Sequence, residues 1–116
     1  MNILVVGFCG SMGKRRVRCL KRLGYTNIAG FDISENSKEV AQKIGVNQIK
    51  DTSDFSNGIV VLSTPPKHHI DLSKQFLSQG CHVFCEASVV PNDRHHYEEI
   101  SRLSSQNKSI FFPSAT

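Results

Sequence analysis

The sequence lacks the features that mark a membrane or secreted protein. No apolar run among the 116 residues approaches the roughly 20 that would span a bilayer. The first residues, MNILVVG, contain neither a basic segment nor a small-residue cleavage site, so they do not resemble a secretory signal. Repeats, low-complexity stretches and internal linkers are absent as well. These absences predict one globular domain in the cytoplasm, without membrane attachment.

The sequence also lacks a zinc-site pattern. Its four cysteines form no CxxC pair, and no second cluster could complete a site. His82 lies between Cys81 and Cys85, which suggests a metal site, but these side chains would not converge if they lie on one strand. We therefore expect no metal and, without a secretion signal, reduced and mostly buried thiols.

Positive charge is present in modest excess. The formal net charge is +4, and much of the excess lies between Lys14 and Arg22. A basic run can bind nucleic acid. No aromatic residue interleaves with this run, and it falls on a predicted helix. We expect a solvated helix face with one or two residues near a phosphate, and no nucleic-acid partner.

Strand and helix patterns alternate along the chain. Short apolar runs predict buried strands, and the helical spacing of Gly13, Val17, Leu20 and Gly24 predicts a helix that lies on a sheet. Such alternation favours an α/β, Rossmann-type fold: a doubly wound parallel sheet in three α/β/α layers, with strand order 3-2-1-4-5-6. The predicted strands are residues 2–6, 27–32, 46–49, 58–63, 82–85 and 109–112, and the predicted helices are residues 11–23, 34–44, 67–78 and 91–105.

The ends of two helices carry their own signals. Ser34 is a candidate N-cap for the helix over residues 34–44, because a serine hydroxyl can accept from a backbone N–H in the first turn. Gly24 and Gly45 are candidate helix stops, since glycine readily adopts the left-handed conformation that often ends a helix.

A glycine-rich turn follows the first predicted strand. It reads Gly7-Phe8-Cys9-Gly10-Ser11-Met12-Gly13, a GxxGxxG pattern one residue longer than the common GxGxxG fingerprint. Glycines there permit a tight exit from the strand, close approach of backbone N–H groups to a pyrophosphate, and close packing of the helix on the sheet. The helix N-terminus then faces the anion. The strand before and the helix after favour a dinucleotide site over an ordinary turn.

Asp32 strengthens the prediction of a dinucleotide site. It ends the second predicted strand, 19 positions after Gly13, where a carboxylate can accept from the adenosine ribose hydroxyls and repel a 2′-phosphate. The alternative is a structural Asp that caps the next helix. With no arginine directly after Asp32, NAD is favoured over NADP, although Arg15 and Arg16 leave NADP open.

With these features placed, the chain resembles the N-terminal half of the Gfo/Idh/MocA family (glucose–fructose oxidoreductase and inositol dehydrogenase). The first stretch that carries the likeness is GFCGSMGKRR, which begins at Gly7 and is followed by Asp32. The second is STPPKHH from Ser63, similar to the family's TPPxxH motif, and the third is FCEAS from Phe84, at the place of its EKP motif. Together they span nearly the whole chain, and their joint order is more specific than any one motif.

The resemblance implies roles for particular residues. Thr64 and Pro65 would lie where the ring end of the cofactor runs, His69 near the nicotinamide, and Glu86 at the cofactor crevice. The alternatives are a rigid turn without ligand contact for Thr64 and Pro65, a histidine that only begins a helix for His69, and an acid that caps the next turn for Glu86. The cofactor-binding candidates are Gly7, Cys9, Gly10, Ser11, Met12, Gly13, Asp32, Ser63, Thr64, Pro65, His69 and Glu86.

Two departures from the family limit what the resemblance implies. Ala87 stands where family members usually carry a lysine that assists proton transfer, and alanine has no titratable group, so no catalytic residue is assigned. The family's substrate domain, which would supply most substrate contacts and an oligomer interface, is not among these residues. We expect this chain to bind the cofactor without turnover on its own, within a parent homo-oligomer.

The resulting hypothesis is the NAD(P)-binding domain of an oxidoreductase. Such an enzyme would move a hydride between a nicotinamide cofactor and a sugar, sugar-nucleotide or cyclitol. One alternative is a stand-alone NAD-sensing module without catalysis, which Ala87 favours and the TPPxxH stretch does not. Another is a methyltransferase that uses S-adenosylmethionine; the Pro65-Pro66 turn and the six predicted strands argue against it.

Overall fold

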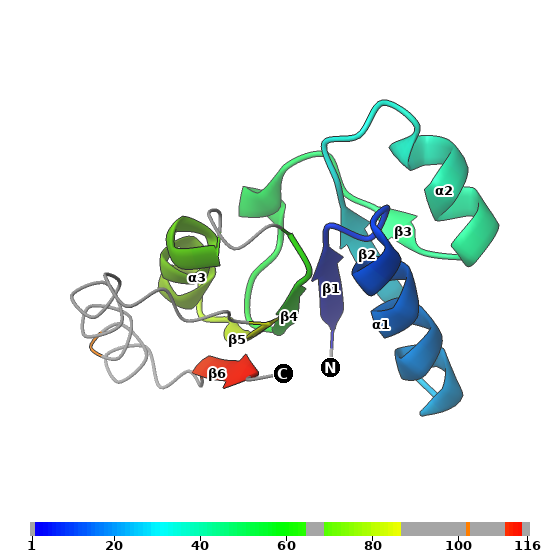
Figure 1. Cartoon of the computed structure of the whole chain (residues 1–116). Coiled ribbons are helices and arrows are strands. Elements are labelled where there is room, and N and C mark those ends of the chain that lie inside the picture. Colours follow the sequence, from blue (N-terminus) through cyan, green and yellow to red (C-terminus); the bar gives the residue numbers. More distant parts are fainter. Residues whose placement is uncertain (1, 65–68, 87–101, 103–110, 115–116) are drawn as a thin grey trace.

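Six parallel strands form one sheet in a computed structural model, which describes residues 2–64, 69–86, 102 and 111–114. The strand order is β3-β2-β1-β4-β5-β6, so the predicted doubly wound Rossmann-type fold is confirmed (Figure 1). The elements are β1 (Ile3–Val6), α1 (Ser11–Arg22), β2 (Ile28–Phe31), α2 (Ser37–Ile44), β3 (Asn47–Gln48), the 3-10 helix η1 (Thr52–Asp54), β4 (Ile59–Leu62), α3 (His69–Ser78), β5 (His82–Glu86) and β6 (Phe111–Ser114).

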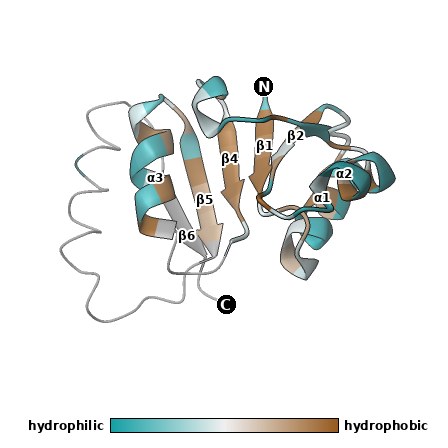
Figure 2. Ribbon diagram, turned by 90° about the horizontal axis from the view of Figure 1, so that it is seen from above, coloured by the Kyte–Doolittle hydropathy of each residue, from teal (hydrophilic) through white to brown (hydrophobic). Residues whose placement is uncertain are grey.

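Both faces of the sheet are covered, because its strands alternate apolar side chains between them. Val5 and Val61 face α1 and α2, where Phe8 and Val17 complete one buried cluster. Leu4, Val6, Val60, Leu62, Val83 and Cys85 face the opposite way and pack with Phe76 and Leu77 of α3. Figure 2 shows the apolar strands between α3 on one side and α1 with α2 on the other.

The predicted helix ends are correct for α1 and partly wrong for α2. Gly24 follows α1 at φ 99, and Gly45 ends α2 at φ 77, as the helix-stop prediction requires. Ser34, however, is not the N-cap of α2. The helix begins three residues later with Asn36 at the cap, because Ser34 lies in a turn in which its carbonyl accepts from the Ser37 N–H.

The outer strands also differ from their predicted bounds. β3 has only two residues, since Asn47 and Gln48 alone pair with β2, while Val46 turns its side chain into the core. β6 is described over Phe111–Ser114, so it continues two residues beyond its predicted end and includes Pro113. This strand lies at the edge of the sheet, where a residue without an N–H can be tolerated.

The basic run on α1 is only partly a solvated face. Lys14, Arg15 and Arg18 are exposed, as predicted. Arg16 is half-buried, and its guanidinium carbon lies 5.3 Å from the centre of the Phe84 ring in β5. Such a placement over an aromatic face is a favourable cation–π contact, so this residue also packs on the sheet.

The connection from β3 to β4 contains η1 rather than a full helix. Gln79, just after α3, holds this connection: its side-chain amide donates to the carbonyls of Thr52 and Phe55, at 3.1 and 2.7 Å. Gln75 donates to the Thr52 hydroxyl and to the Gln79 side-chain oxygen, at 2.7 and 3.1 Å. No residue of this connection is among those that line the pocket at the carboxyl ends of β1, β2 and β4.

The helix predicted over residues 91–105 lies outside the described residues, except for Arg102, which is helical. Among the helices that the structure describes, none is both long and apolar enough to cross a membrane.

Replacing Gln79 by alanine should lower the free energy of unfolding by about 2 kcal/mol, because two partly buried carbonyls each lose their shortest hydrogen bond. Urea unfolding followed by circular dichroism would measure it. Gln42→Ala is the matched control, since Gln42 is an exposed glutamine on α2, and it should leave stability nearly unchanged. Equal losses in the two variants would contradict the structural role given to Gln79.

Candidate functional site

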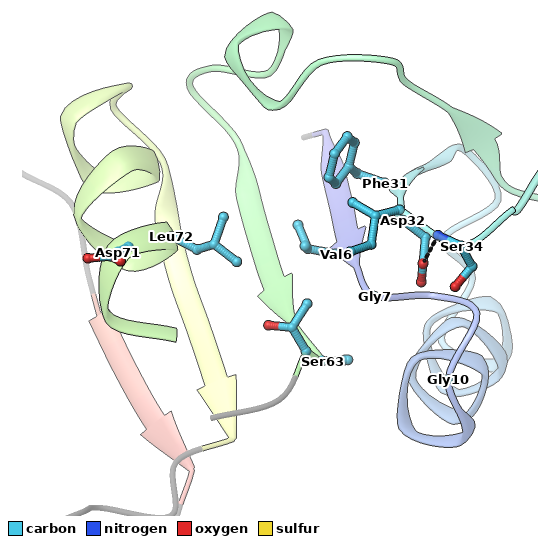
Figure 3. Close-up of a pocket in the computed structure, with 11 residues that line it drawn as sticks. Val6, Gly7, Gly10, Phe31, Asp32, Ser34, Ser63, Asp71 and Leu72 are labelled. Carbon is cyan, nitrogen blue, oxygen red and sulfur yellow. Dashed lines mark hydrogen bonds between the residues drawn. The ribbon is translucent and has the colours of Figure 1, made fainter. Parts of the chain in front are cut away.

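A pocket of about 620 Å³ opens where the carboxyl ends of β1, β2 and β4 meet (Figure 3). This is the point at which the strand order reverses direction, and ligands of open α/β sheets bind at such points. The residues that line the pocket are Val6, Gly7, Gly10, Phe31, Asp32, Ile33, Ser34, Ser63, Thr64, Asp71 and Leu72.

The glycine-rich turn forms one wall of this pocket. Gly7 has φ 85, and a Cβ there would meet the Ser63 carbonyl oxygen at 2.9 Å, so a side chain is excluded both by conformation and by space. A Cβ on Gly13 would overlap the Gly7 carbonyl oxygen and approach Phe8 Cα to 2.5 Å. The N-terminal turn of α1 can therefore lie directly against the turn that leaves β1.

The N-terminus of α1 suits an anion. Gly10 occupies the N-cap position of α1 with φ −73. Within α1 and its cap, which the structure describes completely, no side chain hydrogen-bonds to the N-terminal N–H groups, and the first turn contains no acidic residue. The N–H groups of Ser11, Met12 and Gly13 have no partner inside the helix, as in the first turn of any α-helix. These donors and the helix dipole favour a phosphate group at this position.

Asp32 links the glycine-rich turn to the loop after β2. Its Oδ2 accepts from the Cys9 backbone N–H at 3.0 Å. Its Oδ1 accepts from the Ser34 N–H at 2.9 Å (Figure 3). Partial burial alone would raise the pKa of the Asp32 carboxyl, but these hydrogen bonds outweigh it and the pKa lies below its ordinary value. Asp32 is thus an ionised acceptor at neutral pH, and each oxygen keeps room for a further donor.

The thiol of Cys9 lies beside this carboxylate. Burial and the Asp32 charge raise the pKa of Cys9, so the thiol stays protonated at neutral pH. Cys81 and Cys85 are buried, and burial raises the pKa of Cys85 to about 11, whereas Cys19 is exposed. Among the described residues, no three histidine, cysteine or acidic side chains gather as metal ligands would.

The opposite wall comes from β4 and α3. The Ser63 hydroxyl oxygen is buried in this wall without a hydrogen-bond partner, and Thr64 follows it at the rim. Figure 3 shows Leu72 of α3 directed toward Val6 across the cavity. Together with Val6 and Phe31, Leu72 gives the pocket an apolar floor that suits a flat aromatic group.

The structure brings most of the predicted site residues together. Gly7, Gly10, Asp32, Ser63 and Thr64 line the pocket, whereas four other predicted residues of the turn, Cys9, Ser11, Met12 and Gly13, are not among its lining residues. His69 begins α3 and Glu86 ends β5, and the structure describes only the backbone of these two residues. Pro65 and Ala87 lie outside the described residues.

Sequence reasoning missed the apolar lining of the pocket. Val6 and Phe31 are the last residues of their strands, and their position before Gly7 and Asp32 was a usable signal. Ile33 is 88% exposed beside the pocket, an unusual state for a large apolar residue. Leu72 could not be placed from sequence, because its approach to β1 depends on how α3 packs.

The fold and the pocket together define a dinucleotide-binding Rossmann domain. Consistent with this class, the profile of the Gfo/Idh/MocA family, an oxidoreductase family with an NAD-binding Rossmann fold, matches residues 1–111. The chain belongs to this family. No curated protein matches the sequence.

Solved structures support the fold. Biliverdin reductase from Synechocystis sp. PCC 6803, in complex with biliverdin and NADP+, is similar over 97% of this chain, with a TM-score of 0.84 and 18% identity. Myo-inositol 2-dehydrogenase from Lactobacillus plantarum matches 98%, with a TM-score of 0.80 and 20% identity. GenD2 from gentamicin A biosynthesis, in complex with NAD, also matches 98%, with a TM-score of 0.82 and 19% identity.

The matched region is a minor part of these structures. The chain covers 37%, 36% and 34% of their respective lengths, so it spans little more than a third of each. At these sequence identities the similarity establishes the fold alone, and it does not assign the activities of the three proteins to this chain.

The pH dependence of stability offers a test of the Asp32 hydrogen bonds. Because the pKa of Asp32 is lowered on folding, its contribution is present above the unfolded-state pKa of about 4 and is lost as the pH falls through the folded-state value. Asp32→Asn should therefore be less stable than the wild type at pH 7, and the gap should close on acidification. Urea unfolding between pH 7 and pH 2.5 would measure it; a gap independent of pH would contradict the assignment.

Proposed function

We propose that this chain binds NAD in the pocket at the ends of β1, β2 and β4, as the cofactor domain of an oxidoreductase. The observation that carries the proposal is the Asp32 carboxylate, held ionised between Cys9 and Ser34 at the edge of a glycine-lined helix N-terminus. Ribose hydroxyls need an acceptor, and a pyrophosphate needs uncapped N–H donors beside it. The pocket offers both within one continuous surface.

The described residues suit the adenosine half of the cofactor. Adenine would lie on the apolar floor of Val6, Phe31 and Leu72, with the exposed Ile33 covering it from the loop after β2. Its ribose would donate to Asp32. The pyrophosphate would then cross Gly10 toward the first turn of α1, because a Cβ at Gly10 would be 3.7 Å from its nearest neighbour and the space above is open.

The same geometry favours NAD over NADP. A 2′-phosphate would approach the ionised Asp32, and the residues that follow it, Ile33, Ser34 and Glu35, offer no positive charge. The like-signed charges of carboxylate and phosphate would repel at this partly buried site. Ser63, with its buried and unpartnered hydroxyl, would lie on the path toward the nicotinamide half.

The bound nicotinamide would supply hydride transfer, with a sugar, sugar-nucleotide or cyclitol as the substrate class. This chain would bind and orient the cofactor, while substrate contacts and an oligomer interface would come from another domain. Ala87 offers no proton-transferring group where the family resemblance leads us to expect one. For that reason a non-catalytic NAD-sensing module is the second candidate function.

Direct titration tests the proposal. The purified chain should enhance or shift NADH fluorescence and bind NADH more tightly than NADPH, while S-adenosylmethionine should bind far more weakly. Calorimetry would confirm the order for the non-fluorescent ligand. Preference for S-adenosylmethionine, or no NADH binding at millimolar concentration, would remove the proposed function.

Replacing Asp32 by alanine tests how the pocket chooses its cofactor. The variant loses an acceptor for the ribose and the charge that repels a 2′-phosphate, so NADH affinity should fall about tenfold or more while NADPH affinity changes little. The measurement is the dissociation constant of NADH and of NADPH, each for the wild type and for Asp32→Ala. Equal losses for the two cofactors would make Asp32 a purely structural residue.

A further inference from the structure

The glycine-rich turn holds two residues between its first two glycines, and they go in opposite directions. Phe8 is fully buried, with 0% of its surface exposed, whereas Cys9 is only partly buried beside Asp32. A phenylalanine inside a ligand-binding turn is costly to order unless its ring finds a packed site. Here the ring enters the cluster formed with Val17, Val46 and other residues beneath α1 and α2.

The site for this ring exists because β2 carries a glycine at position 30. A Cβ on Gly30 would lie 2.7 Å from Phe8 Cδ1 and 3.0 Å from Cε1, closer than side-chain atoms can approach. The same Cβ would also meet Val46 Cγ2 at 3.0 Å. Gly30 has extended backbone within a strand, so it is needed for the space it leaves rather than for an unusual φ.

Burial of Phe8 fixes the backbone on both sides of it. The next residue, Cys9, donates its N–H to Asp32, and Gly10 donates to the Gly7 carbonyl at 3.3 Å. On the other side, α1 rests on the Phe8 backbone, since a Cβ on Gly13 would come within 2.5 Å of Phe8 Cα. The N–H groups that would face a pyrophosphate are therefore held at a position that the Phe8 ring determines.

We propose that Phe8, seated against Gly30, is a positioning residue for pyrophosphate binding: it holds the longer GxxGxxG turn in its binding geometry without touching the ligand. This inference rests on the proposed function. A turn that is already ordered loses less conformational entropy on binding, so affinity depends on how firmly the ring is held. The adenine-facing residues Val6 and Leu72 belong to other elements and should not depend on this contact.

A double-mutant cycle tests the proposal with Phe8→Leu, Gly30→Ala and the combined variant. Phe8→Leu leaves a gap, and Gly30→Ala pushes the ring and the turn outward, so each should weaken NADH binding about fivefold or more. In the combined variant the added methyl group occupies space that leucine vacates, so its NADH affinity should be closer to the wild type than that of either single variant. Adenosine, which carries no phosphate, should bind all four proteins within about twofold, as measured by NMR titration.

Val83→Ala is the matched control. Val83 is also fully buried, but it lies near the amino end of β5, a strand with no residue among the described pocket lining, so this variant should lose stability and keep its NADH affinity. If Gly30→Ala does not fold, a comparison of the NADH affinities of Phe8→Leu and Val83→Ala still tests the positioning role of Phe8. Wild-type NADH affinity in Phe8→Leu, or equal losses for NADH and adenosine, would overturn the positioning role alone. Failure of the wild type to bind NADH would overturn both this role and the proposed function.

Discussion

The site depends on the two hydrogen bonds that Asp32 accepts. One comes from Cys9 in the turn after β1 and the other from Ser34 in the loop after β2, so a single carboxylate joins two segments that are 23 residues apart. The pocket lies against both segments, and its shape depends on their staying together. The bond from Ser34 is local, whereas the bond from Cys9 requires β1 and β2 to be paired before it can form.

Close approach of the backbone is the second constraint, and glycines meet it in different ways. Gly13 allows α1 to lie on the turn, whereas Gly30 makes space for an aromatic ring that anchors the same turn from below. Phe8 joins the two, since its backbone supports α1 and its ring contacts β2. The binding surface and the hydrophobic core are thus continuous, and a change in the core can reach the ligand without altering any contact residue.

The β3–β4 connection packs on the same face of the sheet as the apolar part of the pocket. It contains η1 in place of a full helix, Phe55 joins the buried cluster that includes Val6, and the Gln79 side chain fastens it through the Phe55 carbonyl. The apolar floor of Val6 and Phe31 is left accessible at the carboxyl ends of the strands. A ligand with a flat aromatic end and an anionic centre fits a surface that has an apolar floor on one side and the N-terminus of α1 on the other.

The amino-acid sequence by itself predicted the strand order, because strands alternate with helices and their crossovers are right-handed. It also indicated the glycine-rich turn, the helix stops and Asp32, which follow from local position and from backbone conformations that glycine favours. Only the tertiary structure decided that Cys9 donates to Asp32, that Phe8 turns into the core, and that Leu72 reaches the pocket. Each of these depends on partners far away in the chain: a carboxylate directly after β2, a glycine at position 30 and the packing of α3. Contacts of that kind have no local signature, since the energy that selects them arises only when the elements meet.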